Sequence, residues 1–435
     1  MIDYLNWKGK NFMKKIVNNL LDFLNHNHSE FNAANNIREI LKSNGFIELN
    51  EKEDFKIKKG ANYFIVRNDS SVIAFKIPKK LNDFRYAITA SHLDSPCLKL
   101  KMENDIVSNN YHKLNVEKYG GLILSTWLDR PLSLAGRIIV KDGNKLKTQF
   151  IDIEKPLMII PNVCIHFNRN INDGFSYNPE IDLKPILSLG NNESSLMDFL
   201  SEYINVKKED IITYELNTYN FTKSYVGGQH DEFIMSPRID NLESVYLSLM
   251  AFIESDNKDV SVFVAFNNEE IGSETYSGAD CDLLKNTLKR ISNSLGYNEN
   301  EYFSSIANSF MLSIDNGHAT HPNHPELSDS NNPVFLNKGP IIKFNSNMAY
   351  MSDGATSAEI INLCKNNNIP YQIFYNKSDV RGGSTLGTLS TSQLGIRTCD
   401  IGCAQLSMHS SYETAGSEDV EYMFDLIKAF YNSKL

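Results

Sequence analysis

The sequence predicts an α/β protein in which a parallel-rich mixed sheet carries helices on both faces, with a mostly β domain inserted into the chain. Short apolar segments at 86–90 and 262–266 alternate with helical patterns such as 242–253. Such alternation is typical of parallel strands that helices connect. Between residues 97 and 231, in contrast, strand patterns follow one another, and long helical patterns are scarce until about residue 196. These two observations together predict the α/β class with an inserted, mostly β domain.

The chain is expected to begin with two helices and a hairpin. Apolar residues recur at helical spacing over 16–24 and indicate a first helix. A second helix is expected over 33–44, because Gly45 follows it as a typical C-terminal glycine. Segments 61–67 and 72–77 flank the polar stretch Asn-Asp-Ser-Ser, which predicts a β-hairpin. These elements open the main domain.

The middle of the chain is expected to form the inserted domain. Strands are predicted over 98–101, 134–141 and 145–152, with the turn sequence Asp-Gly-Asn between the last two. The expected division is a main domain of residues 1–96 and 232–435 and an inserted domain of residues 97–231.

Beyond the inserted domain, strands and helices alternate again. The expected elements are helices over 242–253, 356–364 and 420–430 and strands over 262–266, 311–314 and 371–374. Ser417 is the expected N-cap of the last helix. Active sites in such sheets gather at the carboxyl ends of the strands. Polar residues directly after apolar strands are therefore the candidates for a functional site.

Composition and charge exclude several classes of protein. The 435 residues carry a formal net charge of −10, and an acidic chain is a poor candidate for nucleic-acid binding, which needs clustered Lys and Arg. The sequence has no run of about 18 apolar residues and no signal-peptide core at its start, so no membrane partner is expected. Six scattered cysteines form no C-x-x-C pair, which suits a reducing compartment. We expect a cytoplasmic protein.

Two candidate metal-site segments lie next to predicted elements. His92 follows the strand at 86–90, and Asp94 is placed to hydrogen-bond the imidazole or its neighbours and fix its orientation. Alone, this pattern also fits a buried, hydrogen-bonded histidine. Asp240 directly precedes the helix at 242–253, where an aspartate can simply cap the helix.

Two adjacent glutamates follow the apolar strand at 262–266. Neighbouring side chains diverge, so Glu269 and Glu270 can do different work. One can bind a metal while the other takes a proton from water. The alternative is a solvated loop or a helix start, where acidic residues are favourable.

Further histidines and an aspartate occur later in the chain. Asp315 comes directly after a predicted strand, and His318, His321 and His324 lie within seven positions of one another just beyond it. A histidine-rich surface loop is the alternative for this stretch. His409 stands alone near the end of the chain, where a lone histidine is usually structural.

Together these side chains make up the inventory of a paired zinc site. Zinc takes nitrogen and oxygen ligands and keeps an open position for catalysis, and a paired site needs a ligand that serves both ions. Asp240 suits this bridge, because one carboxylate offers two oxygens. The sequence contains no G-x-S-x-G, H-E-x-x-H or P-loop motif. Two alternatives remain at this point. One is another hydrolase on the same scaffold, such as a carboxypeptidase or deacylase, and the other is a peptide-binding protein with a decayed site.

These stretches, in this order, resemble the aspartyl aminopeptidase and aminopeptidase I family of zinc metallopeptidases. The similarity runs from about residue 19 to the C-terminus. The matching stretches are 92–96 (HLDSP), 125–130 (STWLDR), 165–169 (IHFNR), 237–241 (PRIDN), 268–273 (NEEIGS), 318–323 (HATHPN), 338–343 (KGPIIK), 383–387 (GSTLG) and 405–410 (QLSMHS).

The resemblance implies a zinc exopeptidase-like catalytic domain with two Zn²⁺ per chain, for which Co²⁺ or Mn²⁺ can substitute. Glu269 would be the general base, and Asp94 would support the site next to the ligands. The implied ligands are His92, Asp240 and Asp315 for one ion, and Asp240, Glu270 and His409 for the other.

The resemblance also implies a substrate and an assembly. The substrates would be short peptides with a free N-terminus, and we expect a preference for acidic first residues, with a broader or neutral-residue aminopeptidase as the alternative. The inserted domain would make dimers within a tetrahedral dodecamer, in which His166 reaches into a neighbour's active site. His318 and Lys343 would contact substrate. Gly317, where the family usually has alanine, is one departure that leaves the side-chain preference open.

Overall fold

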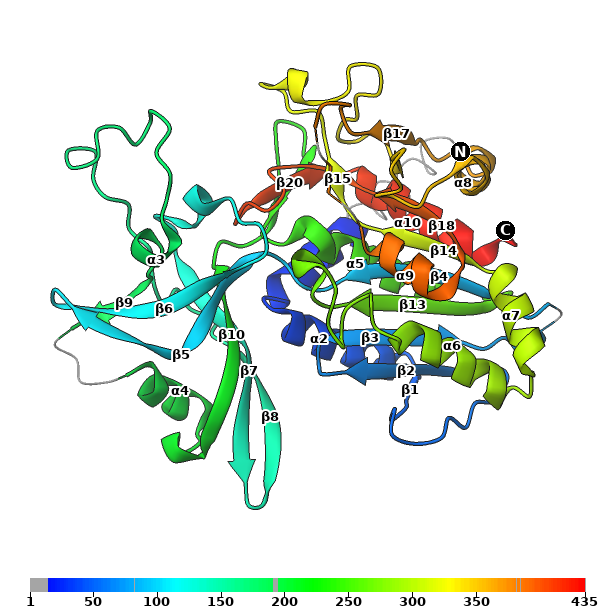
Figure 1. Cartoon of the computed structure of the whole chain (residues 1–435), viewed down its shortest axis with the longest axis horizontal. Coiled ribbons are helices and arrows are strands. Elements are labelled where there is room, and N and C mark those ends of the chain that lie inside the picture. The colour runs from blue at the N-terminus through cyan, green and yellow to red at the C-terminus, as the bar shows by residue number, and fades with distance from the viewer. Residues whose placement is uncertain (1–14, 82, 191–194, 381, 384, 435) are drawn as a thin grey trace.

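The computed structural model describes residues 15–81, 83–190, 195–380, 382–383 and 385–434. Figure 1 shows two parts of the molecule side by side, each built around its own large sheet. A third, smaller sheet lies above the boundary between them in this view. Among the described residues, no helix has both the length and the apolar character that crossing a membrane requires.

The main sheet has nine described strands, and its centre is parallel. Neighbouring strands β13, β4, β14 and β18 all run in the same direction, whereas β3 and β16 flank them in antiparallel pairing. The strands in spatial order are β1 (Ile47–Glu48), β2 (Asn62–Arg67), β3 (Ser71–Lys76), β13 (Val260–Phe266), β4 (Tyr86–His92), β14 (Phe310–Ile314), β18 (Arg397–Gly402), β16 (Ile341–Phe344) and β17 (Gln372–Tyr375).

Helices cover both faces of this sheet, as the alternation along β13 requires. Phe263 and Ala265 pack into the core under one set of helices, and Val262 and Val264 into the core under the other. The helices over the first face are α2 (Glu30–Ser43), α5 (Ile239–Glu254), α8 (Gly354–Asn366) and α10 (Asp419–Asn432), and those over the second are α6 (Leu283–Ser294), α7 (Glu299–Ala307) and α9 (Leu386–Leu394). The predicted α/β class is confirmed.

The second large sheet has six described strands, and all of its pairings are antiparallel. Its strands come from residues 97–220, within the predicted inserted domain, and we call residues 97–231 the inserted region. The strands in order are β8 (Lys145–Asp152), β7 (Leu132–Asp142), β10 (Ile211–Asn220), β5 (Cys97–Ser108), β6 (Tyr111–Tyr119) and β9 (Ile186–Leu189), with helices α3 (Pro179–Asp182) and α4 (Leu196–Ile204) nearby. The boundaries at residues 97 and 231 stay a proposal.

The third sheet brings distant parts of the chain together. Its five described strands are β11 (Tyr225–Gly227), β12 (Phe233–Ser236), β20 (Glu413–Gly416), β19 (Ala404–Leu406) and β15 (Gly317–His318). Strand β12 pairs with β20, and β15 pairs with β19. This sheet therefore places the loop between β19 and β20 beside the segments that carry Asp240 and Asp315.

Several helices begin a few residues before the predicted position, and the caps explain two of these differences. Helix α2 begins at Glu30 rather than at residue 33, because the Ser29 hydroxyl accepts from the backbone N–H of Asn32. The prediction that Ser417 caps the last helix is wrong. Glu418 is the N-cap residue of α10, and the Ser417 hydroxyl donates to the backbone carbonyl of Asp231 instead.

Candidate metal centre

Four of the predicted site residues follow neighbouring parallel strands. His92 is the last residue of β4, and Asp315 comes directly after β14. Glu269 and Glu270 lie in the short 3-10 helix Glu269–Ile271, just beyond the end of β13. Because β13, β4 and β14 are adjacent and parallel, their carboxyl ends meet at one edge of the sheet.

Asp240 and His409 reach the same place from other elements. Asp240 lies at the start of α5 with non-helical backbone angles, φ −77° and ψ 109°. Its Oδ1 accepts no hydrogen bond from the described residues, and its Oδ2 faces His409, so the Asp240 carboxylate does not cap the helix. His409 lies in the loop between β19 and β20.

The carboxylate of Asp240 lies between the two histidines. Its Oδ1 is 3.4 Å from Nε2 of His92, and its Oδ2 is 3.4 Å from Nε2 of His409. On the first side, the His92 Nε2 is also 3.5 Å from Oδ1 of Asp315. On the second side, the His409 Nε2 is 3.4 Å from Oε2 of Glu270. The five side chains thus form two groups of three that share Asp240.

These spacings fit metal coordination. Zinc bonds of about 2.0–2.2 Å in a tetrahedron put neighbouring ligand atoms about 3.3–3.6 Å apart. His92, Asp240 and Glu270 each offer a ligand atom within 4.8 Å of the others. In addition, the buried Oδ1 of Asp240 and Oε1 of Glu270 accept no hydrogen bond from the described residues. Buried acceptors normally have a partner, and a bound cation would supply one here.

The pKa values of the carboxyl groups in the cluster also favour a bound cation. Burial raises the pKa of Glu270 well above its ordinary value, and the charge of Asp240 adds to this effect. Burial also raises the pKa of Glu269, to about 8, against the opposing charge of His92. For Asp240, burial acts in the raising direction, but the imidazoles of His409 and His92 outweigh it and lower the pKa. Several carboxylates crowded in a buried space are stabilised by a cation.

Backbone carbonyls fix the orientation of both imidazoles. Nδ1 of His92 donates to the carbonyl of Asp94 at 3.0 Å, and Nδ1 of His409 donates to the carbonyl of Gly121 at 2.9 Å. Each bond assigns the proton to Nδ1 and leaves Nε2 as a free electron-pair donor that faces the carboxylates.

The carboxylate of Asp94 holds the adjacent glutamates. Its Oδ1 accepts from the backbone N–H of Glu269 at 3.1 Å, and its Oδ2 accepts from that of Glu270 at 3.2 Å. Its Oδ1 is 3.6 Å from Nδ1 of His92, which bonds to the Asp94 carbonyl instead. Asp94 therefore positions the segment that carries both glutamates.

Sequence reasoning missed Glu413, which contacts two of the candidate ligands through their backbone. Its Oε2 accepts from the N–H of Asp240 at 3.1 Å, and its Oε1 accepts from the N–H of His409 at 2.8 Å. Gln405 donates to Oε1 as well, at 3.2 Å. The one available signal was an acidic residue four positions after His409, at the start of the short strand Glu-Thr-Ala-Gly.

The three predicted substrate-contacting residues have different surroundings. Lys343 is only 2% exposed, and its ammonium donates to Oδ2 of Asp315 at 3.2 Å and to the carbonyl of Asn316 at 2.8 Å. His318 is exposed. His166 lies in an exposed loop of the inserted region, and no hydrogen bond or ion pair among the described residues ties it to the cluster of its own chain.

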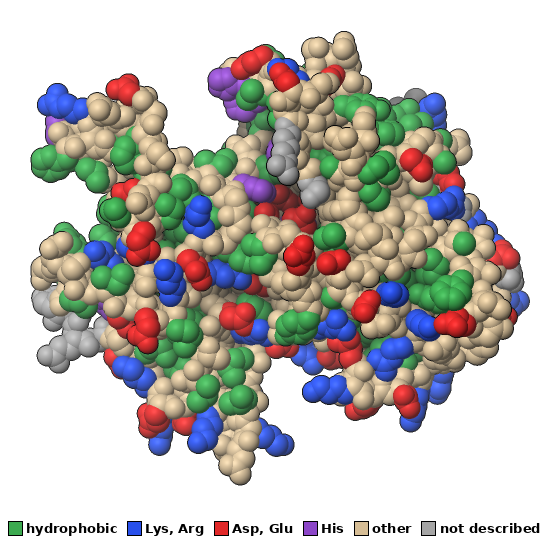
Figure 2. Space-filling view, in the orientation of Figure 1, with side chains coloured by type: hydrophobic (Ala, Val, Ile, Leu, Met, Phe, Trp, Pro, Cys, Tyr) green, Lys and Arg blue, Asp and Glu red, His purple; other side chains and the backbone are tan. Residues whose placement is uncertain are grey.

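A cavity of about 350 Å³ lies beside the cluster. Its lining includes His318, His321 and Lys377, and it reaches Gln405, which bonds to Glu413. The described residues that line it include no aspartate or glutamate. Figure 2 shows acidic side chains at the bottom of a hollow in the middle of the molecule, with a histidine at its rim. This hollow is open to solvent on the face shown.

Histidines and carboxylates that converge at the carboxyl edge of a parallel sheet define a metal-dependent hydrolase. The chain belongs to the aminopeptidase I zinc metalloprotease family, M18, whose model matches residues 23–431. It is an aminopeptidase of that family.

Relatives and solved structures agree with this assignment. A probable M18 family aminopeptidase 2 of Clostridium novyi is 41% identical over 427 residues, which cover 96% of this chain and 99% of the relative. A chain in the cryo-EM structure of the Ape4 and Nbr1 complex superposes with a TM-score of 0.94 at 35% identity, covering 97% of this chain and 86% of that one. The S. cerevisiae mApe1 dodecamer superposes with a TM-score of 0.84 at 25% identity, covering 97% of each chain.

Proposed function

We propose that the protein is a two-zinc aminopeptidase that removes the first residue of short peptides, with a preference for Asp and Glu. The observation that carries the proposal is the position of Asp240, each of whose oxygens lies 3.4 Å from a different histidine. In this proposal Asp240 bridges the ions. His92 and Asp315 complete the first ligand set, and Glu270 and His409 complete the second. Co²⁺ and Mn²⁺ suit the same nitrogen and oxygen donors.

Glu269 is the proposed general base. When bound, the zinc ions polarise the peptide carbonyl and lower the pKa of water towards about 7. The Glu269 carboxylate takes a proton from the attacking water and later gives it to the leaving amine. Burial raises the pKa of Glu269 to about 8, and the positive charge of bound metal ions would lower it and favour the ionised form that a base requires. Asp94 holds Glu269 in place through its backbone N–H.

An aminopeptidase must also recognise the free amino terminus of its substrate. In this proposal the ammonium group anchors near the second ion, beside the carboxylates of the site. The family assignment favours an aminopeptidase over a carboxypeptidase on the same scaffold. Digestion of a tripeptide separates the two by which end is released.

The proposed preference for acidic first residues is supported by the cavity beside the cluster. His318, His321 and Lys377 line this cavity, and the buried ammonium of Lys343 lies close to the carboxylate of Asp315. A carboxylate side chain that enters this space meets cationic and neutral donors.

A panel of peptides with N-terminal Asp, Glu or Leu tests the preference, alongside measurement of the zinc content of the chain. We expect zinc in the purified chain and a kcat/KM about 10-fold to 100-fold higher for the acidic residues, because a hydrogen bond between charged partners is worth about 1.5–3 kcal/mol. The Lys377→Met variant should lose part of the difference, and Lys365→Met, on the exposed side of α8, serves as the control. A clear preference for Leu would refute the acidic specificity and leave a broader aminopeptidase.

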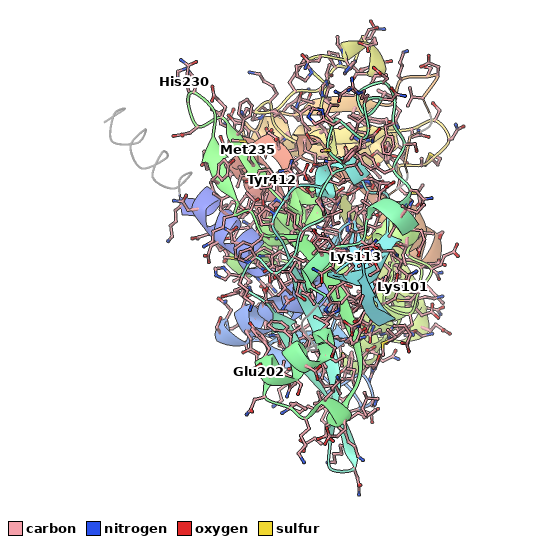
Figure 3. The ribbon with its side chains drawn as sticks, turned by 90° about the vertical axis from the view of Figure 1, so that its left-hand side faces the viewer. Lys101, Lys113, Glu202, His230, Met235 and Tyr412 are labelled. Carbon is pink, nitrogen blue, oxygen red and sulfur yellow. The ribbon has the colours of Figure 1, made fainter. Side chains whose placement is uncertain are left out.

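The proposed assembly is a tetrahedral dodecamer of dimers. Most of the large apolar side chains that stay exposed in the described chain lie in the inserted region, and Phe167, next to His166, is 87% exposed. Large exposed apolar patches mark protein interfaces. Figure 3 shows this side of the molecule, where Lys101 and Lys113 mark the strands β5 and β6. In the proposal, this region binds another copy of the chain, and His166 enters that copy's active site.

Mixed subunits test the proposed role of His166. The His166→Ala chain and the Glu269→Gln chain should each be inactive alone. Co-expressed, they should recover activity, because a site with Glu269 from one chain then receives His166 from another. Light scattering should give the mass of twelve copies for each preparation. Equal inactivity of the mixed and separate preparations would show that His166 acts elsewhere.

We also propose a cytoplasmic location. All six cysteines lie in the described part of the chain, and none of them forms a disulfide. Unpaired cysteines suit a reducing compartment.

A further inference from the structure

One segment of the inserted region contacts the candidate metal site of its own chain at three successive residues. Tyr119 ends β6, and Gly120 and Gly121 follow it. These contacts come from the part of the chain whose expected role is assembly, so they give that part a second role.

The hydroxyl of Tyr119 bonds to the residue that holds the glutamates. It donates to Oδ2 of Asp94 at 2.7 Å and accepts from Nδ2 of Asn268 at 2.9 Å. Asp94 in turn accepts the backbone N–H groups of Glu269 and Glu270. The phenol therefore supports this short segment from both sides, through Asp94 and through the residue that precedes the two glutamates.

The ring of Tyr119 is itself held by charged groups. The ammonium of Lys99 lies 3.9 Å from the centre of the ring, and it donates to Oε1 of Glu30 at 2.9 Å. Lys99 belongs to β5 of the inserted region, whereas Glu30 is the first residue of α2, a helix that covers the main sheet. Both side chains are largely buried. Buried charges that are paired and packed on an aromatic face restrict the position of the ring.

The two glycines contact candidate ligands directly. A Cβ atom on Gly120, which has φ +73°, would lie 3.2 Å from Cβ of Glu270. The carbonyl of Gly121 accepts the Nδ1 proton of His409 at 2.9 Å, and the N–H of Ile123 donates to the His409 carbonyl at 3.1 Å. The second proposed ligand group therefore rests on the segment 119–123 at both Glu270 and His409.

We infer that residues 119–121 of the inserted region form a positioning segment for the metal centre of the same chain, with Tyr119 as the positioning residue. This inference rests on the proposed function, since it takes Glu270 and His409 as ligands. Tyr119 does not supply a ligand atom in this arrangement. It restrains the backbone of Glu269 and Glu270, so that their carboxylates meet the metal ions in a fixed geometry.

The Tyr119→Phe variant tests the inference because it removes one hydroxyl and keeps the ring. The matched control is Tyr214→Phe, which removes the hydroxyl of another buried tyrosine of the same sheet, one that bonds to the Lys101 carbonyl at 2.7 Å. Zinc affinity is measured by competition with a chelator, and the visible absorption of the Co²⁺-loaded chain reports the geometry of the ligands.

We expect Tyr119→Phe to weaken zinc binding about 10-fold to 100-fold, the range found for partners that orient metal ligands. Its Co²⁺ absorption should shift, kcat should fall, and KM should change little, because the hydroxyl does not face substrate. Tyr214→Phe should match the wild-type chain in all four measurements. If wild type binds zinc and hydrolyses peptides while Tyr119→Phe is indistinguishable from it, the inference is overturned and the proposed function stands. If the wild-type chain binds no metal, both the inference and the proposed function are refuted.

Discussion

Replacing Glu269 with glutamine should leave both metal ions bound and lower kcat by about 10²-fold to 10⁴-fold, the usual contribution of a general base. In the structure, Oε2 of Glu269 is 4.0 Å from Nε2 of His92. This distance is longer than the 3.4–3.5 Å spacings within the two ligand groups. The glutamine keeps the size of the side chain but cannot take the proton from water. Zinc content and kcat are measured on the same preparation.

The neighbouring glutamate supplies the contrast for this experiment. Glu270 lies 3.4 Å from Nε2 of His409, within the second ligand group. The Glu270→Gln variant should therefore lose metal as well as turnover, whereas Glu269→Gln loses turnover alone. If Glu269→Gln kept wild-type activity, the assignment of the base would be wrong. Metal loss in Glu269→Gln but not in Glu270→Gln would exchange the two roles.

Replacing Asp240 with asparagine should empty at least one of the two ion positions and abolish hydrolysis. Each oxygen of Asp240 faces one histidine at 3.4 Å, and an amide can offer only one oxygen. Its NH₂ group would then face a histidine and exclude a cation on that side. Because the loss of a mere supporting partner already costs about 10-fold to 100-fold in metal affinity, we expect a loss of more than about 100-fold, read from zinc titration and from peptide hydrolysis.

A matched control separates this effect from the cost of changing any buried carboxylate. Asp419 is as deeply buried as Asp240 and accepts the N–H groups of Asn337 and Gly339 at 2.6 and 2.8 Å. Asp419→Asn should lower the melting temperature while zinc binding persists. Should Asp240→Asn retain two ions at wild-type affinity, the shared bridge would be refuted, and with it the paired site.

Most of the candidate site could be predicted from local patterns. His92, Asp315 and the pair Glu269 and Glu270 each follow an apolar segment that the structure shows to be a strand of the parallel centre. Parallel strands put their carboxyl ends at one edge, so residues far apart in the sequence become neighbours without any knowledge of the coordinates. Asp240 and His409 were harder to predict as site residues, since neither follows a strand of the parallel centre. Only their place in the motif order indicated them.

The errors and omissions lie where contacts are non-local. Ser417 has the composition of an N-cap, but its hydroxyl bonds to the Asp231 carbonyl, 186 positions away in the chain. In the sequence Glu413 is one acidic residue among many, and only the third sheet places it between Asp240 and His409. Tyr119 lies in the inserted region, and only the packing of that region against the main sheet brings its hydroxyl to Asp94.

Periodicity and ordered motifs were sufficient to assign the α/β class and the aminopeptidase family, and strand-end chemistry to propose the metal ligands. Each of these depends on residues within a few positions of one another or on motif order. Which oxygen of Asp240 faces which histidine, the burial of Lys343 against Asp315, and the contact of Tyr119 with Asp94 depend on strand register and on how two sheets pack. Those contacts join residues from about 25 to 170 positions apart. The cost of closing a loop rises only slowly with its length, so the local sequence does not indicate which distant residue a side chain will contact.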